Sequence, residues 1–205
     1  MKLRTIAIVL TVVLASAAAH AQSGAYLTFN ANMWTQEGVN TYVTNPGSQN
    51  TDRPWLLGAG YGVYYDVTHL PYLGKLKTGP VVFGIDARGE TLRNAASYGS
   101  FNQENGIFSI RVATKSPIKG STPYVLGGFG LGHTKVPGRL SYSNNFLYQV
   151  GVGVDSKLCK KIDWRIEADG GALANYATGY YPLGIGPNQS NYMVTVGTGL
   201  VFRIH

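Results

Sequence analysis

The chain has 205 residues, of which 13% are charged and 12% aromatic, with 27 glycines and one cysteine. A single cysteine excludes an internal disulfide, and the formal charge of +7 is too scattered for a nucleic-acid-binding protein. After residue 21 no apolar run is long enough for a membrane-spanning helix. Low charge with many glycines and aromatic residues is typical of many β-strands joined by turns.

The first 21 residues have the layout of a secretory signal peptide. Lys2 and Arg4 precede an apolar run over residues 6–19, which is too short for a good membrane-spanning helix. Ala19-His20-Ala21 fits the rule for cleavage after small residues, so we predict cleavage after Ala21. Residues 22–205 are then one domain, and removal of two basic residues lowers its formal charge to +5. An uncleaved anchor helix is the alternative.

Eight segments with period-2 alternation follow along the chain. The pattern predicts strands over residues 24–34, 55–67, 81–91, 107–115, 124–132, 146–155, 162–172 and 191–205. The last segment has an apolar face from Tyr192 to Ile204 and a small or polar face from Met193 to Arg203. An even set of strands whose last can pair with its first predicts an all-β, eight-stranded antiparallel up-and-down barrel.

The connections between these segments alternate in length and charge. We predict longer links over residues 35–54, 92–105, 133–145 and 173–190, and mostly shorter ones over 68–78, 116–121 and 156–161. Seven of the eight lysines after residue 21 lie in or beside the shorter links: Lys75, Lys77, Lys115, Lys119, Lys157, Lys160 and Lys161. Short periplasmic turns, longer extracellular loops and strands long enough to cross a bilayer predict a transmembrane barrel in the outer membrane. A soluble periplasmic barrel or sandwich is the alternative, because alternation alone does not say which face is inside.

Several stretches resemble the eight-stranded outer-membrane β-barrel family that includes the OmpA transmembrane domain, OmpX and the opacity-type proteins. The resemblance runs from about Gly24 to Arg203 and is strongest in four segments. These are Leu57-Gly58-Ala59-Gly60-Tyr61-Gly62-Val63, Val150-Gly151-Val152-Gly153-Val154-Asp155, Trp164-Arg165-Ile166-Glu167-Ala168-Asp169 and Val196-Gly197-Thr198-Gly199-Leu200-Val201-Phe202. It implies a fold rather than an activity, since none of these stretches is an active-site motif.

Charged residues recur on the small face of the strands. We expect eleven of them to point into the lumen and to pair there: Asp66, Asp86, Arg88, Glu90, Arg111, Asp155, Asp163, Arg165, Glu167, Asp169 and Arg203. Glycines on the same face would make room for Arg and Tyr side chains. A salt-bridged plug is the favoured interpretation, because eight strands enclose little space, and an ion pathway or narrow pore for small solutes is the alternative.

Aromatic residues cluster near the predicted strand ends and in the longer links. Those near strand ends predict girdles at the two membrane interfaces: Trp34, Trp55, Phe108 and Phe146 on the outer side, and Tyr65, Trp164 and Phe202 on the inner side. Those in the links are candidate contacts for an extracellular ligand or host surface: Tyr42, Tyr98, Tyr142, Tyr176, Tyr180 and Tyr181. Ordinary solvated loops are the simpler explanation for the second group.

The sequence favours a structural or adhesin-like role without catalysis. The histidines after residue 21 are His69, His133 and His205, and Thr134 and Lys135 follow His133, so the His-x-Ser pattern of a lipid A deacylase is absent. Spacing typical of metal ligands is also absent, and we expect no cofactor and no nucleic-acid partner. The expected partners are outer-membrane lipid and lipopolysaccharide, and the expected state is a monomer.

Overall fold

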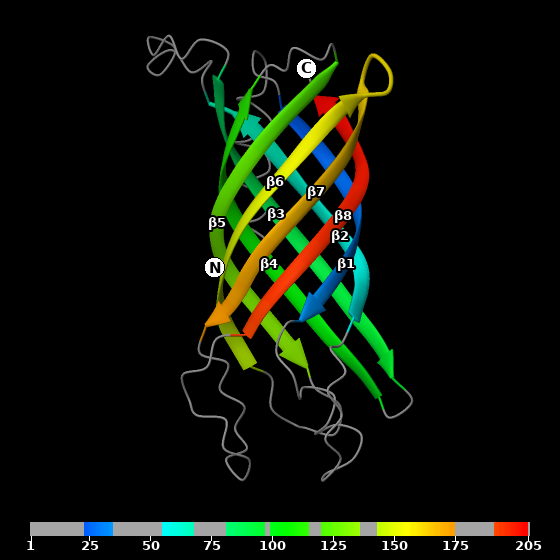
Figure 1. Ribbon diagram of the computed structural model, residues 1–205, viewed down its shortest axis with the longest axis vertical. Helices are drawn as coiled ribbons and strands as arrows, with labels where there is room; N and C mark the ends of the chain where they lie inside the picture. The colour runs from blue at the N-terminus through cyan, green and yellow to red at the C-terminus, as the bar shows by residue number, and fades with distance from the viewer. Residues whose placement is uncertain are drawn as a thin grey trace, which may run out of the picture.

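The computed structural model describes residues 23–34, 55–67, 81–96, 99–114, 120–135, 143–174 and 191–204. Within these ranges the chain forms eight antiparallel strands in sequence order, and β1 pairs with β8 to close a barrel (Figure 1). The strands are β1 (Ser23–Trp34), β2 (Trp55–Asp66), β3 (Val81–Ala96), β4 (Gly99–Thr114), β5 (Ser121–Lys135), β6 (Ser143–Lys157), β7 (Ile162–Ala174) and β8 (Asn191–Ile204). The predicted fold class is confirmed. None of the described residues forms a helix with the length and hydropathy needed to cross a membrane.

The outer wall of the barrel is apolar, and most of the side chains in its interior are polar or charged. Val150, Leu131 and Leu27 point outward with exposed fractions of 68%, 65% and 60%, whereas the inward side chains of Arg165 and Asp86 are 1% and 0% exposed. A water-soluble barrel would place these two kinds of side chain the other way round. The wall is therefore that of a membrane-spanning barrel, and the soluble alternative is wrong.

The barrel has two distinct ends. At the terminal rim β1 begins and β8 ends, with links at residues 67–80, 115–120 and 158–161, and at the loop rim the links are 35–54, 97–98, 136–142 and 175–190. The terminal rim is uppermost in Figure 1, where the β8 arrow ends. In outer-membrane barrels the termini and shorter turns face the periplasm, so the loop rim is the end on the extracellular side.

Two of the four links expected to be long at the loop rim are shorter than predicted. Strand β3 continues to Ala96 and β4 begins at Gly99, so most of the polar stretch 92–105 is strand, and only two residues separate the pair. Likewise β5 extends to Lys135 and β6 starts at Ser143. The error has a physical cause: inward positions of this barrel accept polar side chains, so polarity does not mark the end of a strand.

Aromatic side chains mark the edge of the apolar band near the loop rim. Phe108, Phe129, Phe146 and Tyr148 form a chain of outward-facing rings across β4, β5 and β6, with successive centroids 6.5, 6.2 and 6.5 Å apart. On β4, the outward positions between Phe108 and the loop rim are Gly106 and then the exposed Glu104. The wall therefore turns polar beyond this chain of rings. On the terminal side Trp164 and Phe202 are 45% and 41% exposed, which fits an inner girdle, as predicted. The side chain of Trp34 lies outside the described residues.

Candidate functional site: the barrel lumen

The structure places all eleven sequence-predicted charged residues on the inner face of the barrel. Ten of them are buried: Asp66, Asp86, Arg88, Glu90, Arg111, Asp155, Asp163, Arg165, Glu167 and Asp169. The eleventh, Arg203, lies near the terminal rim, and its side chain is 30% exposed. Their common orientation follows from strand parity, since successive side chains point to opposite faces of the sheet.

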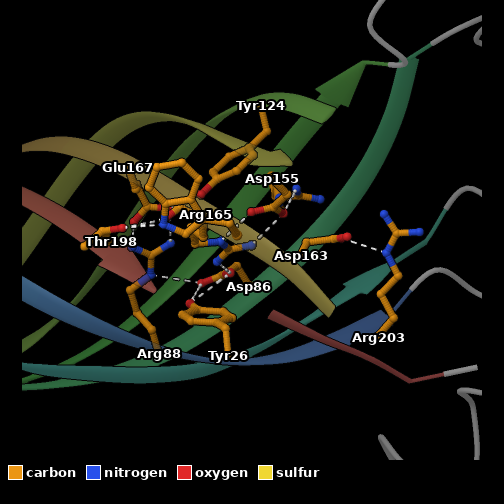
Figure 2. Close-up of polar contacts among 12 residues, drawn as sticks. Tyr26, Asp86, Arg88, Tyr124, Asp155, Asp163, Arg165, Glu167, Thr198 and Arg203 are labelled. Atoms are coloured by element: carbon orange, nitrogen blue, oxygen red, sulfur yellow. Dashed lines mark hydrogen bonds and ion pairs between the residues drawn. The ribbon is translucent and has the colours of Figure 1, made fainter. Parts of the chain in front are cut away.

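Asp155 of β6 binds two arginines at the centre of the lumen. It stands directly opposite Arg165 in the register of β6 and β7, and Arg165 donates from Nε to Oδ1 at 2.8 Å and from Nη2 to Oδ2 at 3.0 Å. Arg111 of β4 donates from Nη2 to the same Oδ2 at 2.8 Å. One carboxylate therefore holds two guanidinium groups from strands on either side of it (Figure 2).

A second set of ion pairs spans the lumen from β3 to β7. Arg88 donates from Nε to Asp86 on its own strand at 3.0 Å, binds Glu167 on the far wall and lies 3.7 Å from Asp169. Tyr124 of β5 donates its hydroxyl to Glu167 Oε2 at 2.5 Å. Arg88 thus ties two opposite walls together (Figure 2).

Three inward tyrosines complete this layer, and the site prediction did not include them. Tyr26 donates its hydroxyl to Asp86 Oδ1 at 2.8 Å, and the Arg165 guanidinium lies 4.1 Å from its ring centre. Arg111 lies between the rings of Tyr64 and Tyr124, at 4.4 and 4.2 Å. We name the charged layer by its members Tyr26, Tyr64, Asp86, Arg88, Arg111, Tyr124, Asp155, Arg165 and Glu167.

Inward glycines make the space that the tyrosines fill. A Cβ atom added at Gly62 would lie 2.5 Å from Tyr26 Cζ, and one at Gly153 would lie 2.5 Å from Tyr124 Cζ. The expectation that small-face glycines make room for large side chains is confirmed at both positions. An inward Tyr with a Gly across the ladder is therefore the sequence signal that could have found these residues.

An apolar layer fills the lumen nearer the loop rim, and sequence reasoning missed it. Its six buried members form one cluster: Leu56, Leu92, Ile107, Leu147, Leu173 and Met193. Each comes from a different strand. Between the two layers Glu90 accepts hydrogen bonds from Asn30 Nδ2 at 3.0 Å and Asn105 Nδ2 at 3.1 Å.

The lumen opens into a cavity at the terminal rim. A cavity of about 440 Å³ there is lined by Asp66, Asp163, Arg203 and Lys157, among others, and reaches as deep as Arg111 and Asp155. Arg203 donates from Nε to Asp163 Oδ2 at 2.7 Å across this cavity (Figure 2). The charged layer forms the floor of the cavity.

His133, the histidine weighed above against the lipid A deacylase pattern, lies on β5 opposite Glu104 of β4 rather than in a loop. In the described ranges, no group of three or more His, Cys, Asp or Glu side chains could hold a metal ion. The six tyrosines proposed as surface contacts lie outside the described residues: Tyr42, Tyr98, Tyr142, Tyr176, Tyr180 and Tyr181.

Comparison with known proteins identifies the fold. No family model and no curated protein sequence matches the chain. Among solved structures, Neisserial surface protein A matches with a TM-score of 0.55 and 11% identity, over 88% of this chain and 97% of that one. This chain has the fold of the eight-stranded outer-membrane β-barrels.

Two further solved structures match at lower TM-scores. The N-terminal β-barrel domain of Pseudomonas aeruginosa OprF gives a TM-score of 0.45 at 13% identity, over 89% of this chain and all of that one. The attachment invasion locus protein Ail of Yersinia pestis gives 0.46 at 10% identity, over 90% and 99%.

Proposed function

We propose that the protein is an outer-membrane barrel with a structural or surface-interaction role and no catalytic activity. In this proposal residues 1–21 direct export and are removed after Ala21, and the mature barrel is a monomer in contact with lipid and lipopolysaccharide. The protein compared above for its fold is named for the cell surface, and we propose the same location here.

The observation that carries the proposal is the filling of the lumen. The charged layer joins opposite walls through Arg88 and Glu167, and the apolar layer adds a second barrier that contains no ion pair. An ion crossing the apolar layer would lose its hydration without gaining a charged partner, which is costly. A barrel filled in two chemically different ways is suited to a scaffold rather than to transport.

A narrow pore for small solutes is the second candidate. It is favoured by one observation, the 440 Å³ cavity that leads inward from the terminal rim to Arg111. For conduction the ion pairs of the charged layer and the packing of the apolar layer would both have to open.

Single-channel recording in planar bilayers separates these two functions. We expect the refolded protein to give no steady conductance, and Leu147→Ala to give none either, because the charged layer remains. Steady channels in the unmodified protein that Arg88→Ala or Arg165→Ala abolishes would show that the layer is an ion pathway, and the scaffold proposal would be wrong.

A lipid A deacylation assay tests the absence of catalysis. We expect no release of fatty acid from lipid A by the refolded barrel, and the same result for His133→Ala. Release that His133→Ala abolishes would make the protein an enzyme.

The surface-interaction part of the proposal rests on the tyrosine-bearing links of the sequence. Cells that carry a variant with Tyr176, Tyr180 and Tyr181 changed to Ser should bind host-cell surfaces less than cells with the unchanged barrel, at equal barrel content. Equal adhesion by the two kinds of cell would contradict the surface-interaction role, and only the structural role would remain in the proposal.

A further inference from the structure

The turn between β6 and β7 carries a dense group of positive charge at the terminal rim. Lys157 ends β6, and Lys160 and Lys161 lie in the turn itself. All three side chains are exposed, and we call these three residues the lysine rim. Leu158 in the same turn is 60% exposed.

The backbone of this turn is fixed by hydrogen bonds to its neighbours. Lys157 N donates to Gly120 O at 2.7 Å, and the amides of Leu158 and Cys159 both donate to Ile162 O at 3.0 Å. Lys161 O accepts from the amide of Arg203 at 2.9 Å, which ties the turn to β8. A fixed turn keeps the backbone positions of the three lysines near one another, so less backbone ordering is needed when a ligand binds.

The described part of the chain supplies no carboxylate to the lysine rim. Among the described residues, none of its three ammonium groups has a carboxylate oxygen within 4.0 Å. Asp163 stands opposite Lys157 in the register of β6 and β7, but it is buried and its Oδ2 accepts from Arg203 instead. No carboxylate among the described residues therefore competes with an external anion for the charge of the rim.

Lys160 and Lys161 of the lysine rim lie beside the lipid-facing wall, whereas Lys157 shares the inward side of β6 with Asp155 and lines the terminal cavity. Trp164 and Phe202 face outward just inside the rim and are 45% and 41% exposed, and Ile204 beside them is 45% exposed. The Trp164 indole N–H donates to Thr198 Oγ1 at 2.8 Å, so its polar edge is satisfied on the barrel wall. Aromatic girdles lie at the level of the lipid headgroups, which places the lysine rim at the phosphate level or just beyond it.

We propose that the lysine rim binds the phosphate groups of anionic phospholipids in the periplasmic leaflet. This inference rests on the membrane placement proposed above. Lysine is a strong phosphate binder as a point charge, and basic clusters beside a membrane are attracted to anionic lipid. The exposed Leu158 and Trp164 supply the apolar contact that a lipid offers and a free phosphate does not.

Quenching of Trp164 fluorescence by brominated lipid measures directly whether anionic lipid is preferred over zwitterionic lipid beside the lysine rim. The protein is prepared with Trp34→Phe and Trp55→Phe, so that Trp164 is the only tryptophan, and refolded into phosphatidylcholine vesicles containing phosphatidylglycerol. Brominating one lipid at a time gives the binding constant of phosphatidylglycerol relative to phosphatidylcholine next to Trp164. The matched control is Arg93→Gln, which removes an exposed cation near the loop rim.

We expect phosphatidylglycerol to be preferred at Trp164. Changing Lys157, Lys160 and Lys161 to Gln should lower that preference at least about fivefold, the attraction expected of one lysine near an anionic surface, and 1 M salt should do the same. Arg93→Gln should leave it unchanged. The inference would be overturned if the triple variant kept the lipid preference of the unchanged protein. It would also be overturned if Arg93→Gln lost as much of that preference as the triple variant. Absence of quenching by either lipid would instead mean that the membrane placement itself is wrong.

Discussion

The charged layer around Arg165 and the apolar layer around Leu147 fill the same lumen, but different forces hold them. In the charged layer each carboxylate has named donors at hydrogen-bond distance, and the partners come from distant walls of the barrel. In the apolar layer six side chains pack against one another, and the directional bonds are two hydrogen bonds that Met193 Sδ accepts from Asn32 and Gln103. The difference predicts that the charged layer is sensitive to the loss of one partner, while the apolar layer is sensitive to lost volume.

The largest expected effect comes from Asp155→Leu. This substitution leaves Arg111 and Arg165 buried without the carboxylate that both contact. Removing one partner of a buried pair costs about 3–5 kcal/mol, and here two cations are affected. Urea unfolding in lipid vesicles should show a loss at the upper end of that range. Asp155→Asn keeps the shape and one acceptor oxygen and should cost clearly less; an equal cost would mean that the lost charge alone, rather than the lost acceptor, sets the penalty.

In the apolar layer, Leu147→Ala should lower the free energy of unfolding by about 2–5 kcal/mol. Leu147 is 1% exposed, so the substitution leaves a cavity. Leu147→Met conserves volume and should cost less than about 1.5 kcal/mol in the same urea experiment. If the Met variant loses as much as the Ala variant, the layer depends on a specific shape, and the contrast with the charged layer disappears.

The wall itself offers a matched pair of glycines, one inward and one outward. A Cβ atom at the inward Gly199 would lie 2.6 Å from Thr28 Cα, a backbone atom, whereas one at the outward Gly170 would meet nothing within 4 Å. We expect Gly199→Ala to cost about 1–3 kcal/mol through backbone displacement and Gly170→Ala to change stability by less than about 0.5 kcal/mol. Similar unfolding curves for the two variants would contradict this packing of β1 against β8.

The smallest expected effect comes from Arg203→Ala at the edge of the charged region. Its side chain is 30% exposed, and water screens its pair with Asp163, so the loss should be about 1 kcal/mol or less. When Arg203→Ala and Asp155→Leu are measured under identical conditions, the difference between their losses in free energy of unfolding shows how strongly the contribution of an ion pair depends on its depth in the lumen. A loss as large as that of Asp155→Leu would mean that depth has no such influence.

Strand parity was sufficient to predict the strands and the inward direction of the eleven charged residues assigned to the lumen. Parity could not reveal pairing across the lumen, because Arg88 and Glu167 are 79 residues apart and lie on opposite walls. The apolar layer was missed for a related reason: residues such as Leu56 and Met193 are isolated in the sequence and meet only after the sheet closes. The stretch 92–105 was misassigned because inward Gln103 and Asn105 resemble loop residues.

Heat modifiability tests the central claim, a closed membrane barrel with an apolar wall, most directly. The outer membrane is isolated from cells that make the protein, and the sample is run on an SDS gel with and without boiling. The account predicts that the protein is found in this membrane, as a compact unboiled band that shifts on boiling. A protein that stays in the soluble periplasmic fraction and shows no shift would contradict it, because the apolar face would then be a core.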